Sequence, residues 1–151
     1  MENIFTINTA KQAAEDNSLK RWVIDFLCAE GKNKHLAKHL TESEDLWVKL
    51  IEFPINKLRR EMGPTEEGLT FSEDKKIWNK RIQSFVKDLN NGYKPCPLIA
   101  TDFWEDIHLA DGSHRHEALS QAGIDKYWTI FFLKNIENKK WITDNSESAV
   151  G

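Results

Sequence analysis

The pattern of apolar and polar residues changes near the middle of the second half of the chain. Residues 106–110 form a short, mostly apolar run that is typical of a strand, and Asp111 and Gly112 interrupt it. Apolar residues from Ala118 onward then follow helical spacing until Gly123. The pattern predicts a strand, a tight glycine turn and the first turn of a helix.

The first 45 residues have the pattern of helices. Asn8 or Thr9 can cap a long helix that Gly31 ends. The apolar residues at helical spacing in it are Ala10, Ala13, Ala14, Trp22, Val23, Phe26 and Leu27. Residues 33–41 predict a second, shorter helix.

Short strands around one long helix are predicted from residue 47 onward. Trp47–Phe53 reads as the first strand, which Pro54 ends. Residues 63–68 read as a loop, either a lid over a ligand or a plain insertion. We expect Ser72 to cap a helix that ends at Asn91 and Gly92. Its apolar stripe consists of Ile77, Trp78, Ile82, Phe85, Val86 and Leu89.

The remaining strands are expected at residues 98–101, 106–110 and 127–133. The last of these is apolar on both faces, as a central strand of a sheet should be. The chain becomes polar from Lys134, and we expect its end to fray, although Trp141 and Ile142 could dock on the core. The fold class is therefore α/β (α+β), with a small mixed sheet and flanking helices.

The predicted turn at residues 111–115 carries groups that bind anions. The first turn of a helix leaves backbone N–H groups unpaired, and the helix dipole places partial positive charge there. Gly112 lets the backbone approach a ligand, Ser113 can cap the helix or donate a hydrogen bond, and Arg115 offers a guanidinium suited to phosphate. A plain structural turn, with Ser113 as cap and Arg115 as a surface charge, is the alternative.

The motif Asp111-Gly112-Ser113-His114-Arg115 resembles the Asp-Gly-x-x-Arg loop of the ParB/sulfiredoxin-like superfamily, which includes ParB-like nuclease domains, partition proteins, sulfiredoxin and a free serine kinase. The Pro-containing strand at 94–100 fits the same pattern, so the likeness runs from about Trp47 to Leu133. It implies three parts: an N-terminal helical extension (1–45) packed on the core, a ParB/sulfiredoxin-like domain (46–135) and a C-terminal tail (136–151).

The resemblance also implies a function, namely binding of a nucleotide or phosphate group by a stand-alone domain. The residues expected to bind phosphate are Gly112, Ser113, His114, Arg115, Arg60 and Lys94. The catalytic candidates are Asp111, His114 and Glu61, for hydrolysis of a nucleoside triphosphate, phosphotransfer or cleavage of a phosphodiester. A non-catalytic regulator, or a module that binds DNA or a protein partner, is the alternative.

Two family activities are disfavoured by the sequence. Ser113 stands where sulfiredoxin has its nucleophilic cysteine, and an unassisted hydroxyl cannot replace a thiolate near neutral pH. Fewer than thirty residues follow Ile124, which leaves no room for the DNA-binding and dimerisation regions of a partition protein.

Expectations about cofactors follow from the same residues. Magnesium would enter with ATP, ADP or CTP, held mainly by the phosphates. His35 and His39 lie one turn apart, yet no nearby carboxylate or thiol completes a metal site, so zinc is not expected, nor are haem and flavin. Cys28 and Cys96 lack metal spacing and read as reduced thiols of a cytoplasmic protein.

Expectations about partners are weaker. A net charge of −3 argues against a strong general grip on DNA. A local basic patch could still contact it, formed by Lys11, Lys20, Arg21, Lys32, Lys34, Lys38, Lys57, Arg59 and Arg60. The aromatic-rich N-terminal helices could form a homo-oligomer contact. No membrane span or signal peptide is expected, because the longest apolar run, residues 127–133, is too short.

Overall fold

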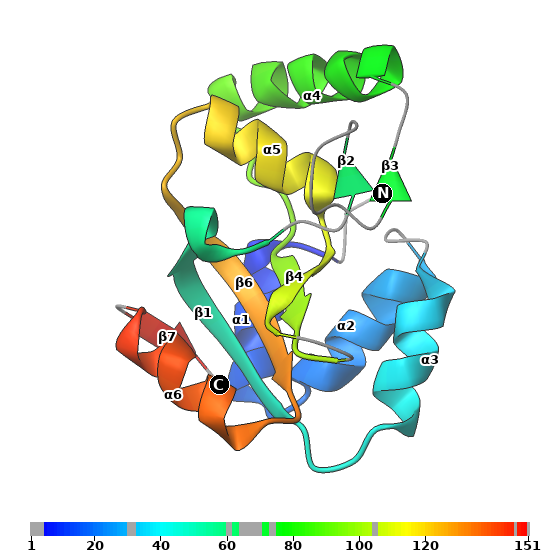
Figure 1. Cartoon of the computed structure of the whole chain (residues 1–151), viewed down its shortest axis with the longest axis vertical. Coiled ribbons are helices and arrows are strands. Elements are labelled where there is room, and N and C mark those ends of the chain that lie inside the picture. Colours follow the sequence, from blue (N-terminus) through cyan, green and yellow to red (C-terminus); the bar gives the residue numbers. More distant parts are fainter. Residues whose placement is uncertain are drawn as a thin grey trace.

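A mixed sheet with helices on both faces forms the centre of the computed structural model (Figure 1). The structure describes residues 5–29, 33–59, 62–63, 71–72, 75–103, 106–146 and 148–150. The helices are α1 (Ile7–Glu15), α2 (Leu19–Cys28), α3 (Lys34–Glu42), a 3₁₀ turn (Ile55–Lys57), α4 (Lys75–Asn90), α5 (Ser113–Gln121) and α6 (Ile136–Asp144). The strands are β1 (Trp47–Pro54), β2 (Met62–Gly63), β3 (Phe71–Ser72), β4 (Leu98–Thr101), β5 (His108–Asp111), β6 (Lys126–Leu133) and β7 (Ser148–Val150).

The strand order of the main sheet is β5-β4-β6-β1-β7. Strands β4 and β6 run parallel, and the other neighbours pair antiparallel. The predicted mixed sheet with flanking helices is therefore confirmed. The short strands β2 and β3 pair separately, in parallel.

Strand β6 shows why both faces of the sheet need a cover. Ile130 and Phe132 face one apolar cluster, while Phe131 and Leu133 face the other. The first cluster is closed by the apolar sides of α1, α2 and α3, and the second by residues of α5 and α6. The helices of the first 45 residues thus share a core with the sheet.

Figure 1 shows α4 lying over α5, on the side of α5 away from the sheet. Trp78 and Ile82 of α4 are buried against Ala118 of α5. Ile77 was expected in the same stripe, yet 49% of it is exposed, so it lies outside this contact. Helix α5 is consequently held between two layers.

The N-terminal region is where the helix prediction was wrong. The chain forms two helices instead of one, and Asn17 between them takes a left-handed conformation with φ of 60°. The N-cap residue of the first helix is Thr6, whereas Asn8 or Thr9 was expected. Thr6 and Thr9 form a reciprocal capping box, in which each side chain bonds the backbone N–H of the other residue. The apolar residues keep helical spacing across this turn, which is why the sequence pattern predicted a single helix.

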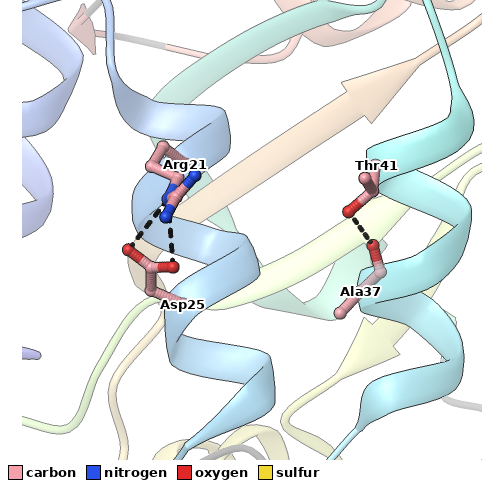
Figure 2. A network of polar contacts seen from close by, with 4 residues as sticks. All are labelled: Arg21, Asp25, Ala37 and Thr41. Atoms are coloured by element: carbon pink, nitrogen blue, oxygen red, sulfur yellow. Dashed lines mark hydrogen bonds and ion pairs between the residues drawn. The ribbon is translucent and has the colours of Figure 1, made fainter.

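Helices α2 and α3 lie side by side (Figure 2). In α2 the Arg21 guanidinium contacts the Asp25 carboxylate at 3.1 Å, and in α3 the Thr41 hydroxyl donates to the Ala37 carbonyl at 2.8 Å. Both contacts stay within one helix, so they support the helices without joining them. The apolar residues between the helices provide the packing.

Two further expectations are corrected. Ser72, which was expected to cap α4, lies in strand β3, and the helix is observed from Lys75. Residues 148–150 pair with β1 as an edge strand, whereas the end of the chain was expected to fray. Ile142 docks as expected and is fully buried. Within the described residues, no helix combines the length and apolar character needed to cross a membrane.

Candidate functional site

The loop between β5 and α5 is the candidate site, and Gly112 determines its shape. Gly112 occupies the N-cap position of α5 with φ of 106° and ψ of 27°, a left-handed conformation that favours glycine. Ser113 was expected to be the cap but is the first helical residue instead. Glycine has no side chain, so the N-cap residue itself makes no capping hydrogen bond to α5. The amides of the first helical turn are groups suited to bind an acceptor.

Arg115 lies beside this helix end, and its position differs from the expectation. Its Nη2 donates to the Asp111 carboxylate at 3.2 Å and to the Pro97 carbonyl at 3.1 Å. The side chains of Arg115 and Asp111 are each 15% exposed. The guanidinium that was expected to be available to an anion is thus already paired with an acid.

The arginine is nevertheless only partly satisfied. Both of its hydrogen bonds use Nη2, and its Nε is buried without a hydrogen-bond partner among the described residues. The guanidinium carbon also lies 5.6 Å from the centroid of the Phe26 ring. A buried donor without an acceptor is costly, so this arginine has donor capacity left over.

The space beside Gly112 explains why glycine is needed there. A Cβ at this position would lie 2.8 Å from Arg115 Nη2 and 3.0 Å from Leu98 Cδ2. The guanidinium therefore packs directly against the glycine backbone. Any larger residue would push it away from Asp111 and Pro97.

The histidines near the loop serve other contacts. The His114 ring stacks obliquely on Trp78 of α4, with 4.7 Å between ring centroids, and lines a groove with α4 residues. His116 is buried, and its Nε2 donates to the Ile55 carbonyl at 2.7 Å, which ties α5 to the 3₁₀ turn. His114 was expected at the anion end, but its ring contacts α4.

Lys94, the other predicted phosphate ligand among the described residues, lies in a different place. Lys94 lines a cavity to which none of residues 111–115 contributes. Arg60 and Glu61 lie outside the described residues. The Arg59 carbonyl accepts a hydrogen bond from the Leu109 N–H at 2.7 Å, so the chain just before Arg60 runs along the edge of β5.

Two contacts of Arg115 were missed by the sequence analysis. Phe26 and the Pro97 carbonyl both touch the guanidinium, and they come from parts of the chain far from Arg115. No local pattern points to them. The Asp111–Arg115 pair, in contrast, joins residues only four positions apart, on either side of the Gly112 turn.

Tyr127 lies near Arg115 and is protonated over the ordinary pH range. Burial raises the pKa of its hydroxyl above the usual 10.0, while the positive charge of Arg115 opposes the shift. The hydroxyl donates to the Pro95 carbonyl. Tyr127 thus fixes the segment that leads to Pro97, on which Arg115 rests.

The side chains of the described residues form no metal centre of their own, and part of the expected basic patch is engaged within the chain. They contain no group of three His, Cys, Asp or Glu side chains able to hold a metal ion. Several cations of the expected basic patch have contacts within the chain: Lys20 donates to the Ser43 carbonyl, Arg21 pairs with Asp25, and Lys57 donates to Asn145.

The apolar residues proposed for a homo-oligomer contact are used inside the molecule. Trp22 is 9% exposed and Phe26 3%, and both pack in the core that the N-terminal helices share with the sheet. An oligomer through these two side chains would need them to leave that core.

Comparisons with protein-family models, curated proteins and solved structures gave no match to this chain.

Proposed function

We propose that this chain contains a ParB/sulfiredoxin-like domain that binds the phosphate of a nucleotide at the Asp111–Arg115 loop. The proposal depends on one observation: the N-terminus of α5, where Gly112 offers no side-chain cap, lies beside a half-buried arginine whose Nε is buried without a hydrogen-bond partner among the described residues. Amides at a helix end and a guanidinium are both phosphate ligands. The order of elements supports the family assignment: a segment with Pro95 and Pro97 leads into β4 before the loop, and the apolar strand β6 follows α5.

The Asp111 carboxylate limits this binding. It neutralises Arg115, so the remaining attraction for an anion comes mainly from the first-turn amides and the helix dipole. A bound phosphate would compete with Asp111 for the guanidinium. We therefore expect modest affinity for phosphate alone, and higher affinity when Asp111 loses its charge.

Binding without chemistry is the form of the proposal that the geometry favours. Asp111 is held in an ion pair, and the His114 ring packs on Trp78, so neither is oriented as a general base toward the loop. Glu61, the third catalytic candidate, lies outside the described residues. Hydrolysis or phosphotransfer is the second candidate.

Magnesium fits this site only together with a nucleotide. Asp111 supplies one carboxylate near the loop, and a single carboxylate with phosphate oxygens is a common arrangement for Mg²⁺. When bound, the ion would neutralise phosphate charge. The protein's own part would remain the orientation of the phosphate by the amides of Gly112 and Ser113.

Calorimetric titration with ATP, ADP, CTP and inorganic phosphate, each with and without Mg²⁺, tests the proposal. We expect Arg115→Ala to lower the affinity about tenfold or more, the loss typical of one charge-assisted hydrogen bond. Asp111→Asn should raise the affinity in the absence of Mg²⁺, because it removes the competing carboxylate. Phosphate release measured on the same samples decides between binding and hydrolysis.

Arg21→Ala is the matched control. Arg21 also pairs with an aspartate at i, i+4 spacing but is 79% exposed and lies on α2 (Figure 2). It should leave nucleotide affinity unchanged. Absence of nucleotide and phosphate binding in the folded wild-type protein would refute the proposal, as would equal effects of the two arginine substitutions.

A further inference from the structure

A second cavity lies away from the candidate anion loop, between α1 and the sheet. Its volume is about 470 Å³, which is within the range of small-molecule sites. We call it the α1 cavity. Its lining residues come from the start of α1, from β1, from the end of α4 with the segment that follows, and from the chain after α5 into β6: they include Lys11, Glu52, Tyr93, Lys94, Tyr127 and Trp128.

Aromatic rings form much of the wall of the α1 cavity. Tyr127 and Trp128 come from the start of β6, and Tyr93 follows α4. The Tyr127 hydroxyl is engaged with the Pro95 carbonyl, so it is committed within the protein. Tyr93 is 49% exposed, which places it at the rim. A flat apolar body would find favourable ring contacts in such a site.

Two lysines give the α1 cavity a net positive charge. Lys11 Nζ lies 4.4 Å from the centroid of the Trp128 ring, and Lys94 comes from the segment after α4. Neither lysine forms a salt bridge with a described residue. Glu52 is the single acid of the lining, so the three charges sum to one positive charge.

From this combination we propose that the α1 cavity binds a small aromatic carboxylate. The ring would pack between the aromatic walls, and the carboxylate would accept hydrogen bonds from the ammonium groups of Lys11 and Lys94. Glu52 repels a second negative charge, which favours a monoanion over a phosphate monoester. None of residues 111–115 lines this cavity, so the inference is independent of nucleotide binding at the loop.

The test uses two probes that share a phenylethyl group and carry opposite charge, 3-phenylpropionate and phenethylamine, with ¹H–¹⁵N NMR. The Trp128 indole signal, assigned with Trp128→Phe, reports on the cavity wall. We expect 3-phenylpropionate to shift this signal and to bind about tenfold or more tightly than phenethylamine, because the net charge of the lining favours an anion. Inorganic phosphate should not shift it.

Substitutions of the two lysines should remove the preference for the anion. Lys11→Met and Lys94→Met keep the length of the side chain but lose the charge, and each should weaken 3-phenylpropionate binding. Lys87→Met is the control, because Lys87 is exposed on α4 and does not line the α1 cavity. The amide spectrum of each variant shows whether the fold is retained.

Several outcomes would overturn the proposal. It is overturned if neither probe shifts the Trp128 signal, or if phenethylamine binds as tightly as 3-phenylpropionate. It is also overturned if Lys94→Met binds 3-phenylpropionate as tightly as Lys87→Met does. Glu52→Gln gives an independent check, because removal of the acid should tighten 3-phenylpropionate binding. A decrease in that variant with a native spectrum would also contradict the assignment.

Discussion

Replacement of Gly112 by alanine tests whether the loop geometry is as described. At φ of 106° an alanine is strained, and the left-handed conformation costs about 1–2 kcal/mol for a residue with a Cβ. The new Cβ would also lie 2.8 Å from Arg115 Nη2 and 3.0 Å from Leu98 Cδ2. Relief of this clash requires movement of the guanidinium away from Asp111 and Pro97.

The loss of those hydrogen bonds adds to the backbone cost. Hydrogen bonds to charged groups contribute about 1.5–3 kcal/mol, and we use the lower end because the end of the flexible Arg115 side chain can shift and keep part of its contacts. We expect Gly112→Ala to reduce the free energy of unfolding by about 3 kcal/mol in all. For a chain of this size that corresponds to a melting temperature roughly 6–12 °C lower.

Urea unfolding of Gly92→Ala separates the backbone cost from the cost of the lost Arg115 hydrogen bonds. Gly92 has a similar φ of 93°, but a Cβ there would meet no atom within 4 Å. It should cost only about 1–2 kcal/mol, the backbone term alone. In an Arg115→Ala background, the cost of Gly112→Ala should fall toward that of Gly92→Ala. Equal costs of the two glycine substitutions in the wild-type background would refute the reasoning.

Three further substitutions test other parts of the fold. Ile142→Ala removes a fully buried side chain and should cost about 2–5 kcal/mol in urea unfolding, whereas Ile77→Ala, at a site 49% exposed, should cost much less. Thr6→Ala removes the cap of α1 and should cost about 1 kcal/mol; no change would contradict the capping box. Because burial raises the pKa of Tyr127, the folded state favours the neutral phenol, and this contribution is complete below the unfolded value of 10.0 and lost as pH rises above it. Tyr127→Phe should therefore flatten the decline of stability as the pH rises above about 10. The exposed control Tyr93→Phe should keep it.

Strands and helices with strong local patterns could be predicted from the sequence. The first strand was expected at residues 47–53 and is observed at Trp47–Pro54. A short, largely apolar run that ends at a proline is typical of a strand. The helix before Gly92 ends where expected, at Asn90, but begins at Lys75, and the strand expected at 106–110 is observed at His108–Asp111, so it includes Asp111. Each of these signals lies within a dozen residues of the element it defines.

Elements that depend on distant partners were predicted less well. Residues 148–150 form a segment of only three residues after a polar stretch, and it is a strand through its pairing with β1. The break at Asn17 has a local signal in Asp16-Asn17-Ser18, but helical spacing continued on both sides and outweighed it. Long-range packing decided both cases.

The candidate site shows the same division. Gly112 and the helix start could be predicted, because a left-handed glycine before a helix follows from the local sequence. The burial of Arg115 could not, because Phe26 and the Pro97 carbonyl reach it only through the tertiary fold. The sequence supplied the groups at the site but not their contacts.

The Asp111–Arg115 pair decides whether this loop is scaffold or binding site, and the two roles predict opposite signs. If the pair only holds α5 against the strand before it, then Asp111→Asn and Arg115→Ala both lower stability, with less than additive effects in the double variant, and neither changes phosphate binding. If the loop binds phosphate, the two substitutions move affinity in opposite directions, because one removes a competitor and the other a ligand. A purely structural ion pair does not predict opposite changes in phosphate affinity for the two substitutions. The sign of the change in affinity on Asp111→Asn therefore distinguishes the two roles better than its size does.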